Sequence, residues 1–214
     1  MLVLEQDQAL LLKLDKPNRV LQTIPSAQLY NGNPNIVTVP HRLDEVKVLN
    51  NLGIKAPSPV DHYYAWPGRF QPFKHQRETV NFLVQNKRAM VLNDIGTGKT
   101  LSALWAADYL MEAGLVRKCL VLSPLSTLDR VWADGVFHSF PNRTYVTVHG
   151  SAAKRRKLMG IDHDFYIVNH DGFRIVEPYI TDEFDLIIVD EAAVYRNPQS
   201  QRFKKFVKFL EKDR

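Results

Sequence analysis

The sequence predicts an α/β fold in which a parallel sheet is covered by helices on both faces, preceded by a small mixed α+β module. Three observations predict it. Short segments made only of apolar residues alternate with helical patterns over most of the chain, and the period-2 alternation of a half-exposed sheet is absent. A stretch rich in proline and aromatic residues, 56–72, sets the first part of the chain apart.

The N-terminal module, residues 1–55, is expected to mix strands and one helix. Apolar runs of strand length at 2–4 and 9–14 flank a polar turn, and 36–39 reads as a further strand after the turn signal 31–34. Leu43, Val46 and Leu49 recur at helical spacing up to Gly53, a plausible helix end. Such a short module can bury little apolar surface alone, so we expect it to lean on the main domain.

The connector, residues 56–72, is predicted to be loop or extended chain because its prolines lack an N–H donor and disfavour helix before them. The main domain, residues 73–214, then alternates strands and helices. Its strand candidates are Ala89–Leu92, Cys119–Leu122, Tyr145–Val148, Phe165–Val168 and Leu186–Val189. Helical spacing of apolar residues is found around 80–84 and 101–105, and at Phe203, Phe206, Val207 and Leu210. Ligands of such sheets bind beyond the carboxyl ends of the strands.

Composition excludes several classes of protein. Of the 214 residues, 45% are hydrophobic and 24% charged, which is ordinary for a globular protein and excludes a disordered chain. The longest apolar run, Ala103 to Ala107, is too short to cross a membrane, and no signal-peptide pattern opens the chain. The net charge of +5 is compatible with a polyanionic partner without requiring one.

The single cysteine, Cys119, cannot form an intrachain disulfide and fits a reducing compartment. We therefore expect a cytoplasmic protein of a bacterium or a phage-infected cell, or a nuclear one in a eukaryote. The 7 histidines show no ligand spacing with cysteine, so no zinc site is expected.

The loop after the first strand candidate has the composition of a phosphate-binding loop. It reads Asn93, Asp94, Ile95, Gly96, Thr97, Gly98, Lys99, Thr100. Glycines let backbone N–H groups turn toward a phosphate, the lysine adds positive charge, and the following helix N-terminus adds its partial charge. Thr100 offers a hydroxyl to Mg²⁺. Asn93 stands where the strict pattern has glycine, a mild departure because asparagine tolerates left-handed conformations. The sequence therefore predicts a nucleotide phosphate and Mg²⁺ as ligands.

Two carboxylates end the last strand candidate. Asp190 can hold Mg²⁺, directly or through water, and Glu191 can polarise an attacking water. In the same alternating domain as the phosphate loop, they are interpreted as the second half of a nucleotide site.

An ordered series of segments resembles superfamily-two nucleic-acid translocases of the SWI/SNF-type branch. These segments are 73–76, which ends in Gln76; 93–100; 120–124, which contains Ser123; 148–151 with Gly150 and the downstream Arg155 and Arg156; 167–170 with Asn169 and His170; and 190–193 followed by 196–198. The resemblance covers about residues 70–205. It implies the first of two RecA-like lobes of a motor that moves on duplex or branched DNA by ATP hydrolysis.

The resemblance also implies roles for single residues. Gln76 would contact adenine, Lys99 and Thr100 would hold phosphate and metal, Asp190 would hold the metal and Glu191 would act as base. Ser123, Asn169 and His170 would face the DNA backbone, and Gly150, Arg155 and Arg156 are further candidates for nucleic-acid contact. The basic run 154–157 is as compatible with a solvated helix face as with a phosphate contact.

Two departures from the family pattern bear on mechanism. Ala193 stands where the family usually has histidine, so coupling between nucleotide and DNA is expected to run differently. The family's next motif and its second lobe, which would supply an arginine to the transition state, do not follow within the 214 residues. We therefore expect a truncated motor that hydrolyses ATP very slowly alone.

Two alternatives remain open for the function. The chain could be a nucleic-acid or protein binding module without turnover, or another P-loop enzyme such as a small-molecule kinase. The N-terminal module has a weaker resemblance to the HepA-related accessory domain, and a family-specific extension explains it equally well.

Overall fold

The structure is a computed structural model that describes residues 1–211; the last three residues of the predicted lobe, 212–214, lie outside the described part. The chain divides into two compact units. The first contains residues 1–65 and 77–90, and the second contains 66–76 and the chain from 91 onward. The sequence-based division into 1–55, 56–72 and 73–214 stays a prediction.

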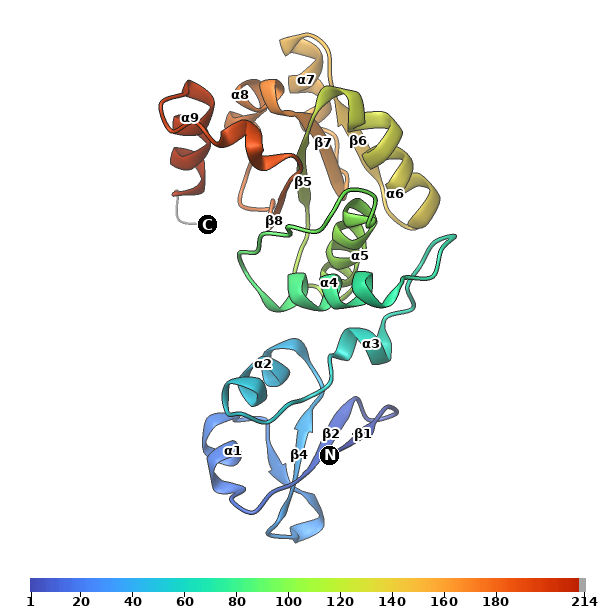
Figure 1. The fold of residues 1–214 in the computed structure, drawn as a ribbon, viewed down its shortest axis with the longest axis vertical. Coiled ribbons are helices and arrows are strands. Elements are labelled where there is room, and N and C mark those ends of the chain that lie inside the picture. The colour runs from blue at the N-terminus through green and yellow to red at the C-terminus, as the bar shows by residue number, and fades with distance from the viewer. Residues whose placement is uncertain (212–214) are drawn as a thin grey trace. The chain divides into compact units, whose positions relative to one another are not determined.

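The first unit is built on a four-stranded antiparallel sheet in the order β1-β2-β4-β3 (Figure 1). The strands are β1 (Leu2–Leu4), β2 (Ala9–Lys13), β3 (Gln28–Leu29) and β4 (Ile36–Pro40). One face buries Leu10 and Leu12 of β2 against α1 (Asn18–Thr23) and α2 (Leu43–Asn51), whose Val20, Val46 and Leu49 complete the core. The helix α2 stops where the sequence predicts, just before Gly53, which has a left-handed φ of 82°.

The connector contains a helix, so its prediction as loop or extended chain is wrong in part. The helix α3 (Pro59–Tyr63) starts with proline at its first position, and Ser58 Oγ accepts a hydrogen bond from Val60 N at 3.3 Å. Proline at this position loses no helical hydrogen bond, and a serine cap satisfies one free N–H. Pro59 therefore begins the helix α3, although proline inside a helix would break it.

A buried histidine holds this helix to the sheet of the first unit. His41, which follows β4, is only 2% exposed, and its Nε2 donates to the Pro57 carbonyl at 2.9 Å. Its Nδ1 lies 2.9 Å from the Tyr63 hydroxyl, which donates to it when the ring is neutral. Burial lowers the pKa of His41, so the ring is held in the neutral form.

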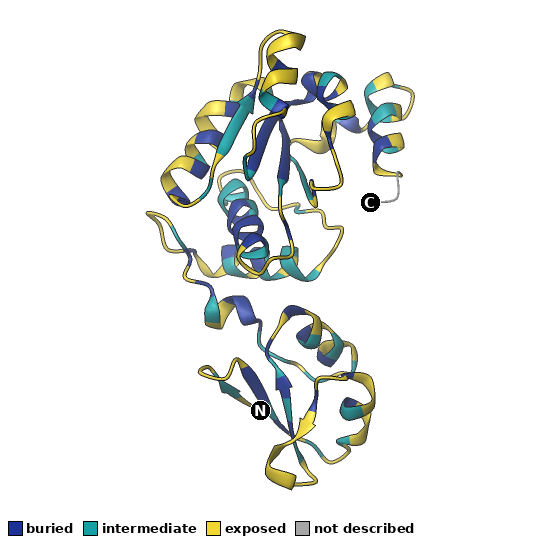
Figure 2. Ribbon diagram, turned by 180° about the vertical axis from the view of Figure 1, so that it is seen from behind, coloured by how far each residue is buried: buried dark blue, intermediate teal, exposed yellow. Residues whose placement is uncertain are grey.

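The second unit contains a four-stranded parallel sheet in the order β6-β7-β5-β8, which confirms the predicted fold class. Its strands are β5 (Cys119–Ser123), β6 (Tyr145–Val148), β7 (Phe165–Asn169) and β8 (Leu186–Val189). Every residue of the inner strands β5 and β7 is buried, as the dark strands in Figure 2 show, so both faces of the sheet are covered. The single thiol, Cys119, is fully buried on β5, and burial raises its pKa.

One expected strand of this sheet does not form. Residues 89–92 have no strand pairing, and Met90 and Leu92 are 69% and 84% exposed. A four-residue apolar run gains strand stability only from cross-strand partners and burial. Without either it remains irregular, and β8 forms an edge of the sheet.

Helices cover the two faces of the parallel sheet. Leu120 and Leu122 lie in one core with side chains of α7 (Ala152–Met159), α8 (Phe173–Val176) and α9 (Gln201–Leu210). On α9 the buried residues are Phe206 and Phe209, whereas Leu210 of the predicted stripe is 46% exposed. The π-helical segment Leu128–Ala133 contacts β6 and β7 and runs into α6 (Asp134–Ser139), which packs on α5 (Lys99–Glu112). A further helix, α4 (Lys74–Gln85), is found where the sequence predicts one, and most of it, from residue 77, belongs to the first unit.

The amino ends of the strands are joined by charged side chains. Arg117, just before β5, pairs with Asp185, just before β8, at 3.0 Å. Lys118 pairs with Asp162 and Glu183 at 2.8 and 2.7 Å. Asp164 accepts from Thr144 N at 2.7 Å, so 162–164 is a structural loop in which both aspartates have partners. These contacts hold together the amino ends of the strands, whereas ligands of parallel sheets bind at the carboxyl ends.

Within residues 1–211, no helix is both long and apolar enough to pass through a lipid bilayer.

Candidate nucleotide-binding site

The loop 93–98 leads directly into α5 and has the backbone geometry that its glycines allow. Gly96 and Gly98 have φ of 81° and 77°, left-handed values that glycine adopts without steric cost. A Cβ on Gly98 would lie 2.1 Å from Gln76 Nε2, so a side chain at this position would have to displace the Gln76 amide. The helix α5 has 14 residues and no acidic side chain in its first turn. Its positive end is therefore available to an anion.

Gln76 supports this loop from α4. Its side chain is 8% exposed; its Nε2 donates to the Thr97 carbonyl at 3.2 Å, and its Oε1 accepts from Phe73 N at 2.9 Å. His75 Nε2 also donates to the Thr97 carbonyl, at 3.1 Å. Both ends of the Gln76 amide are thus bonded to the backbone, which fixes the side chain beside the glycine loop.

The ammonium group of Lys99 lies within its own loop. Its Nζ donates to the carbonyls of Asn93 and Asp94, at 2.9 and 2.8 Å. Thr97 Oγ1 donates to the same Asp94 carbonyl at 2.9 Å. The positive charge of Lys99 and the two glycines therefore lie together at the start of α5. Ile95, in the same loop, is fully exposed.

The two carboxylates follow β8 with different surroundings. Asp190 N donates to the Leu122 carbonyl at 2.8 Å, which extends the pairing with β5. Its Oδ1 accepts from Glu191 N at 3.0 Å, and its Oδ2 accepts from the indole Nε1 of Trp132 at 3.1 Å. Glu191 is exposed and has left-handed φ and ψ of 49°, unusual for a residue with a side chain.

Lys99 and Asp190, from the two halves of the predicted site, are each bonded to other groups of the second unit. In residues 1–211, no hydrogen bond or ion pair joins Lys99 to Asp190; each is bonded to its own neighbours. Both halves belong to the second unit. The assignment of 93–100, Asp190 and Glu191 to one nucleotide site stays a prediction.

The chemistry of the donors fits magnesium. Thr100 and Asp190 offer hydroxyl and carboxylate oxygens, the ligand type that Mg²⁺ prefers. Among the described residues, no group of three or more His, Cys, Asp or Glu side chains is gathered as a metal site. Mg²⁺ usually binds one or two carboxylates and completes its shell with phosphates and water.

Most of the residues expected to face nucleic acid are buried. Ser123, Arg155, Asn169 and His170 are at most 7% exposed, whereas Gly150 and Arg156 are exposed. Arg155 Nε donates to the Gly150 carbonyl at 3.0 Å, and its Nη1 to the Val148 carbonyl at 2.6 Å. This guanidinium fixes the loop after β6 from inside. On α7 the exposed basic side chains are those of Lys154, Arg156 and Lys157.

His170 links the ends of two strands. Its Nδ1 lies 3.3 Å from the hydroxyl of Tyr195, five residues after Asp190, and the rings meet edge to face. Burial and the nearby Arg202 lower the pKa of His170, and burial raises the pKa of Tyr195 to about 12. Both groups are therefore held neutral. A hydrogen bond with the Asp190 backbone opposes this lowering of the His170 pKa, and the buried Oδ1 of Asn169 has no hydrogen-bond partner within residues 1–211.

Trp132 is the residue of this site that sequence reasoning missed. In the sequence nothing distinguishes it from other apolar aromatic residues. The one available signal is chemical: a buried indole N–H requires an acceptor. The sequence does not say which one.

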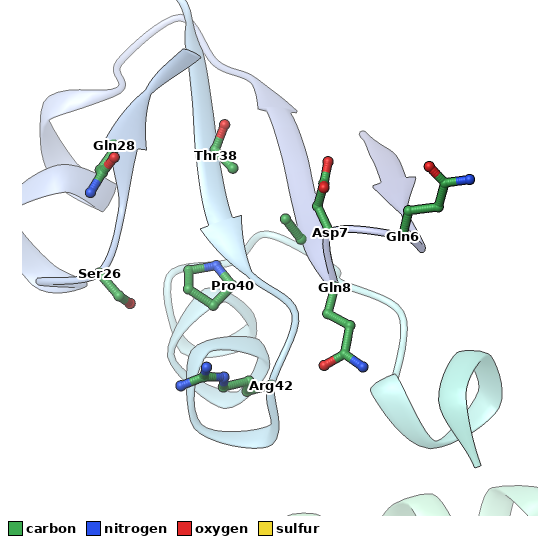
Figure 3. Close-up of a pocket in the computed structure, with 9 residues that line it drawn as sticks. Gln6, Asp7, Gln8, Ser26, Gln28, Thr38, Pro40 and Arg42 are labelled. Carbon is green, nitrogen blue, oxygen red and sulfur yellow. The ribbon is translucent and has the colours of Figure 1, made fainter.

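The first unit carries a separate hollow of about 450 Å³ that the sequence did not indicate (Figure 3). Its walls come from the β1–β2 turn, β3 and β4, with the charged groups Asp7 and Arg42 among amide and hydroxyl side chains (Figure 3).

Comparison with known proteins agrees on one family. The sequence model of the SNF2-related domain matches residues 75–214. Protein CHROMATIN REMODELING 4 of Arabidopsis thaliana is 28% identical over 156 residues, which cover 61% of this chain and 7% of that protein. The SWI/SNF-related matrix-associated actin-dependent regulator of chromatin subfamily A-like protein 1 of Xenopus laevis is 29% identical over 143 residues, 64% of this chain and 14% of that protein. The chain thus spans only a small part of the length of these relatives.

Two solved structures share the fold. The Sulfolobus solfataricus SWI2/SNF2 ATPase core in complex with dsDNA superposes with a TM-score of 0.56 at 21% identity, covering 65% of this chain and 30% of that one. The UvsW helicase from bacteriophage T4 superposes with a TM-score of 0.55 at 16% identity, covering 90% of this chain and 82% of that one. The second likeness extends well beyond the parallel-sheet unit.

Proposed function

Because the chain belongs to the SNF2-related domain family, we propose that it is the ATP-binding half of a DNA-dependent ATPase that translocates on or remodels DNA. The observation that carries the proposal is the glycine loop 93–98. Its two glycines have left-handed backbone angles, and Gly98 lies against Gln76. The helix that follows the loop has no acidic side chain in its first turn. A loop of this kind is built to receive the phosphates of a nucleotide.

In the proposed mechanism, each site residue has one role in binding or hydrolysing ATP. The Lys99 ammonium exchanges its carbonyl contacts for phosphate oxygens, and the N–H groups of the loop bind the remaining oxygens. Thr100 Oγ1 and the Asp190 carboxylate would hold Mg²⁺, which would neutralise charge on the phosphates. The Glu191 carboxylate, exposed at the end of β8, accepts the proton of the attacking water. Gln76 is proposed to contact the adenine through the same amide that supports Thr97.

DNA is the proposed partner, on the side of the sheet where the strands end. The exposed cations of α7 would contact phosphates, while Arg155 holds the loop beneath them. A second RecA-like lobe is proposed to supply an arginine to the transition state, an addition worth about 10³–10⁵ in rate in related systems.

The experiment compares two substitutions. Lys99→Ala should remove ATP binding by this chain, measured with a fluorescent ATP analogue. Glu191→Gln should leave binding intact and lower DNA-stimulated hydrolysis by about 10²–10⁴ when the chain is joined to a second lobe. Lys47→Ala, on α2 of the first unit, is the control and should change neither. Unchanged turnover in both site variants would contradict the proposal.

A binding module without turnover is the second candidate, because the Lys99 ammonium is bonded to the carbonyls of its own loop. It predicts DNA binding that weakens with salt while hydrolysis stays absent even with a second lobe present. Measured hydrolysis in that form would exclude it.

A further inference from the structure

The carboxylate of Asp190 is oriented by two donors, one for each oxygen. Glu191 N lies 3.0 Å from Oδ1, and the Trp132 indole Nε1 lies 3.1 Å from Oδ2. The first donor belongs to the next residue and would move with the loop. The second comes from 58 positions away along the chain and fixes the carboxylate against another part of the fold. Each carboxylate oxygen retains a lone pair for a further ligand.

The segment that carries Trp132 is unusual and firmly placed. Trp132 is 2% exposed and belongs to the π-helical segment Leu128–Ala133. π-Helical turns are rare and occur frequently at functional sites. Thr147 Oγ1 of β6 donates to Asp129 Oδ1 of this segment at 2.8 Å, so one turn of the segment is tied to the sheet.

The same segment leads toward the phosphate loop. It continues into α6, whose Gly135 lies so close to α5 that a Cβ there would be 2.9 Å from Leu104 Cδ1. The helix α5 begins at Lys99. One continuous stretch of chain thus contacts both the helix of the phosphate loop and the carboxylate of Asp190.

We propose that Trp132 is a positioning residue that orients the Asp190 carboxylate toward Mg²⁺ bound with the nucleotide. The proposal rests on the proposed function of this site. Partners that orient a metal ligand from behind raise metal affinity, and losing one typically costs 10–100-fold.

The chain offers a matched tryptophan for comparison. Trp105 on α5 is also fully buried, and its Nε1 donates to the Pro67 carbonyl at 2.9 Å. Both indoles are satisfied core groups, but only that of Trp132 bonds to a carboxylate of the site. Replacement by phenylalanine removes the indole N–H and some packing in each case. A difference in Mg²⁺ binding between the two variants therefore reflects the loss of the bond to Asp190 rather than the loss of a buried indole N–H in general.

The first test measures the Mg²⁺ concentration that half-saturates binding of a fluorescent ADP analogue to the 214-residue chain. Trp132→Phe should raise this concentration about 10–100-fold, and Trp105→Phe should change it less than about twofold. Equal Mg²⁺ dependence of the two variants and the wild type would overturn the role of Trp132 and leave the proposed function standing. Failure of the wild-type chain to bind Mg²⁺ and nucleotide would instead overturn the proposed function.

The second test needs no variant of Trp132 to fold. The chain has 3 tryptophans, so its ¹H–¹⁵N spectrum has three indole signals, which can be assigned by Trp66→Phe and Trp105→Phe with the third by elimination. Adding Mg²⁺ to the ADP-bound chain should shift the Trp132 signal and leave that of Trp105 in place. An unmoved Trp132 signal on Mg²⁺ binding would contradict the proposal.

Discussion

At the scale of single residues, two glycines of the site lie against side chains that occupy the space of a Cβ. Gly98 has no room for a Cβ because Gln76 occupies that space. Arg155 and Asn169 similarly fill the space beside Gly172, where a Cβ would lie 2.1 Å from Arg155 Nη1. These close approaches tie one loop of the site to α4 and another to α7.

Gly98→Ala should abolish nucleotide binding, because the new methyl group displaces Gln76 from the loop. The left-handed backbone adds a cost of about 1 kcal/mol in the free energy of unfolding. Gly114→Ala is the matched control: its φ is 70°, just after the other end of α5, and no atom lies within 4 Å of the added Cβ. In urea unfolding Gly114→Ala should lose only the backbone cost and Gly98→Ala at least as much, and only Gly98→Ala should fail to bind a fluorescent ATP analogue. Normal binding by Gly98→Ala would show that the Gln76 contact is dispensable.

Arg155 and Arg156 are neighbours with opposite expected roles. Arg155→Gln should lower the free energy of unfolding by about 1–3 kcal/mol, because buried carbonyls lose their donor. Arg156→Gln should change stability by less than about 0.5 kcal/mol. It should instead reduce the slope of log K for DNA against log salt concentration by about 1, the loss of one phosphate contact. Urea unfolding and salt-dependent anisotropy measure the two quantities, and identical results for both variants would contradict this division.

At the scale of elements, the sequence predicted well what is set by local pattern. The predicted runs 119–122, 145–148, 165–168 and 186–189 all form strands; β5 and β7 are buried throughout, and β6 and β8 are mostly half-buried. The run 89–92 is also apolar and remains unpaired, because pairing depends on a partner strand that the residue types of the run do not reveal. Ser58 and Pro59 begin α3 although proline suggested a break, and α1 was missed because six residues carry too little periodicity.

The site was predictable to the same extent. The glycine loop and the acidic pair are recognisable from residue types in order along the chain. The role of Trp132 and the burial of Arg155 depend on which distant groups the fold brings beside them, so no pattern in the sequence contains them.

The contact between His41 and α3 should make the first unit sensitive to acid. Burial lowers the pKa of His41 in the folded state below its ordinary value near 6.5. The neutral ring therefore stabilises the fold above about pH 6.5, and this stability is lost as the pH falls through the lower folded-state value. His62 adds to the lowering, and Tyr63 and Glu5 are the other titratable groups of the cluster.

The measurement is the melting midpoint by far-UV circular dichroism between pH 8 and pH 5. The wild type should lose stability below about pH 6.5 more steeply than His41→Gln, which cannot be protonated there. His149→Gln, at an exposed position of the second unit, should keep the wild-type profile. Parallel curves for wild type and His41→Gln would refute the assignment.

At the scale of the whole molecule, ligand binding and fluorescence report on the same unit. The phosphate loop, Asp190 and all 3 tryptophans belong to the second unit. Tryptophan fluorescence therefore follows the unfolding of the unit that is proposed to bind nucleotide. The first unit has its own apolar core and no tryptophan.

Mg²⁺ and ADP should raise the fluorescence-detected stability by about 2.7 kcal/mol at a concentration 100 times the dissociation constant. The reason is linkage: a ligand that binds only the folded unit shifts its unfolding equilibrium. Lys99→Ala should show no increase, because its loop lacks the ammonium. Stabilisation of Lys99→Ala equal to that of the wild type would place the nucleotide elsewhere.

The burial of Cys119 has a practical consequence for experiments. Because the only native thiol is inaccessible within β5, a maleimide dye would react selectively with a cysteine introduced at the surface, for example Lys154→Cys on α7. Site-specific labelling for single-molecule fluorescence therefore does not require the removal of Cys119 first.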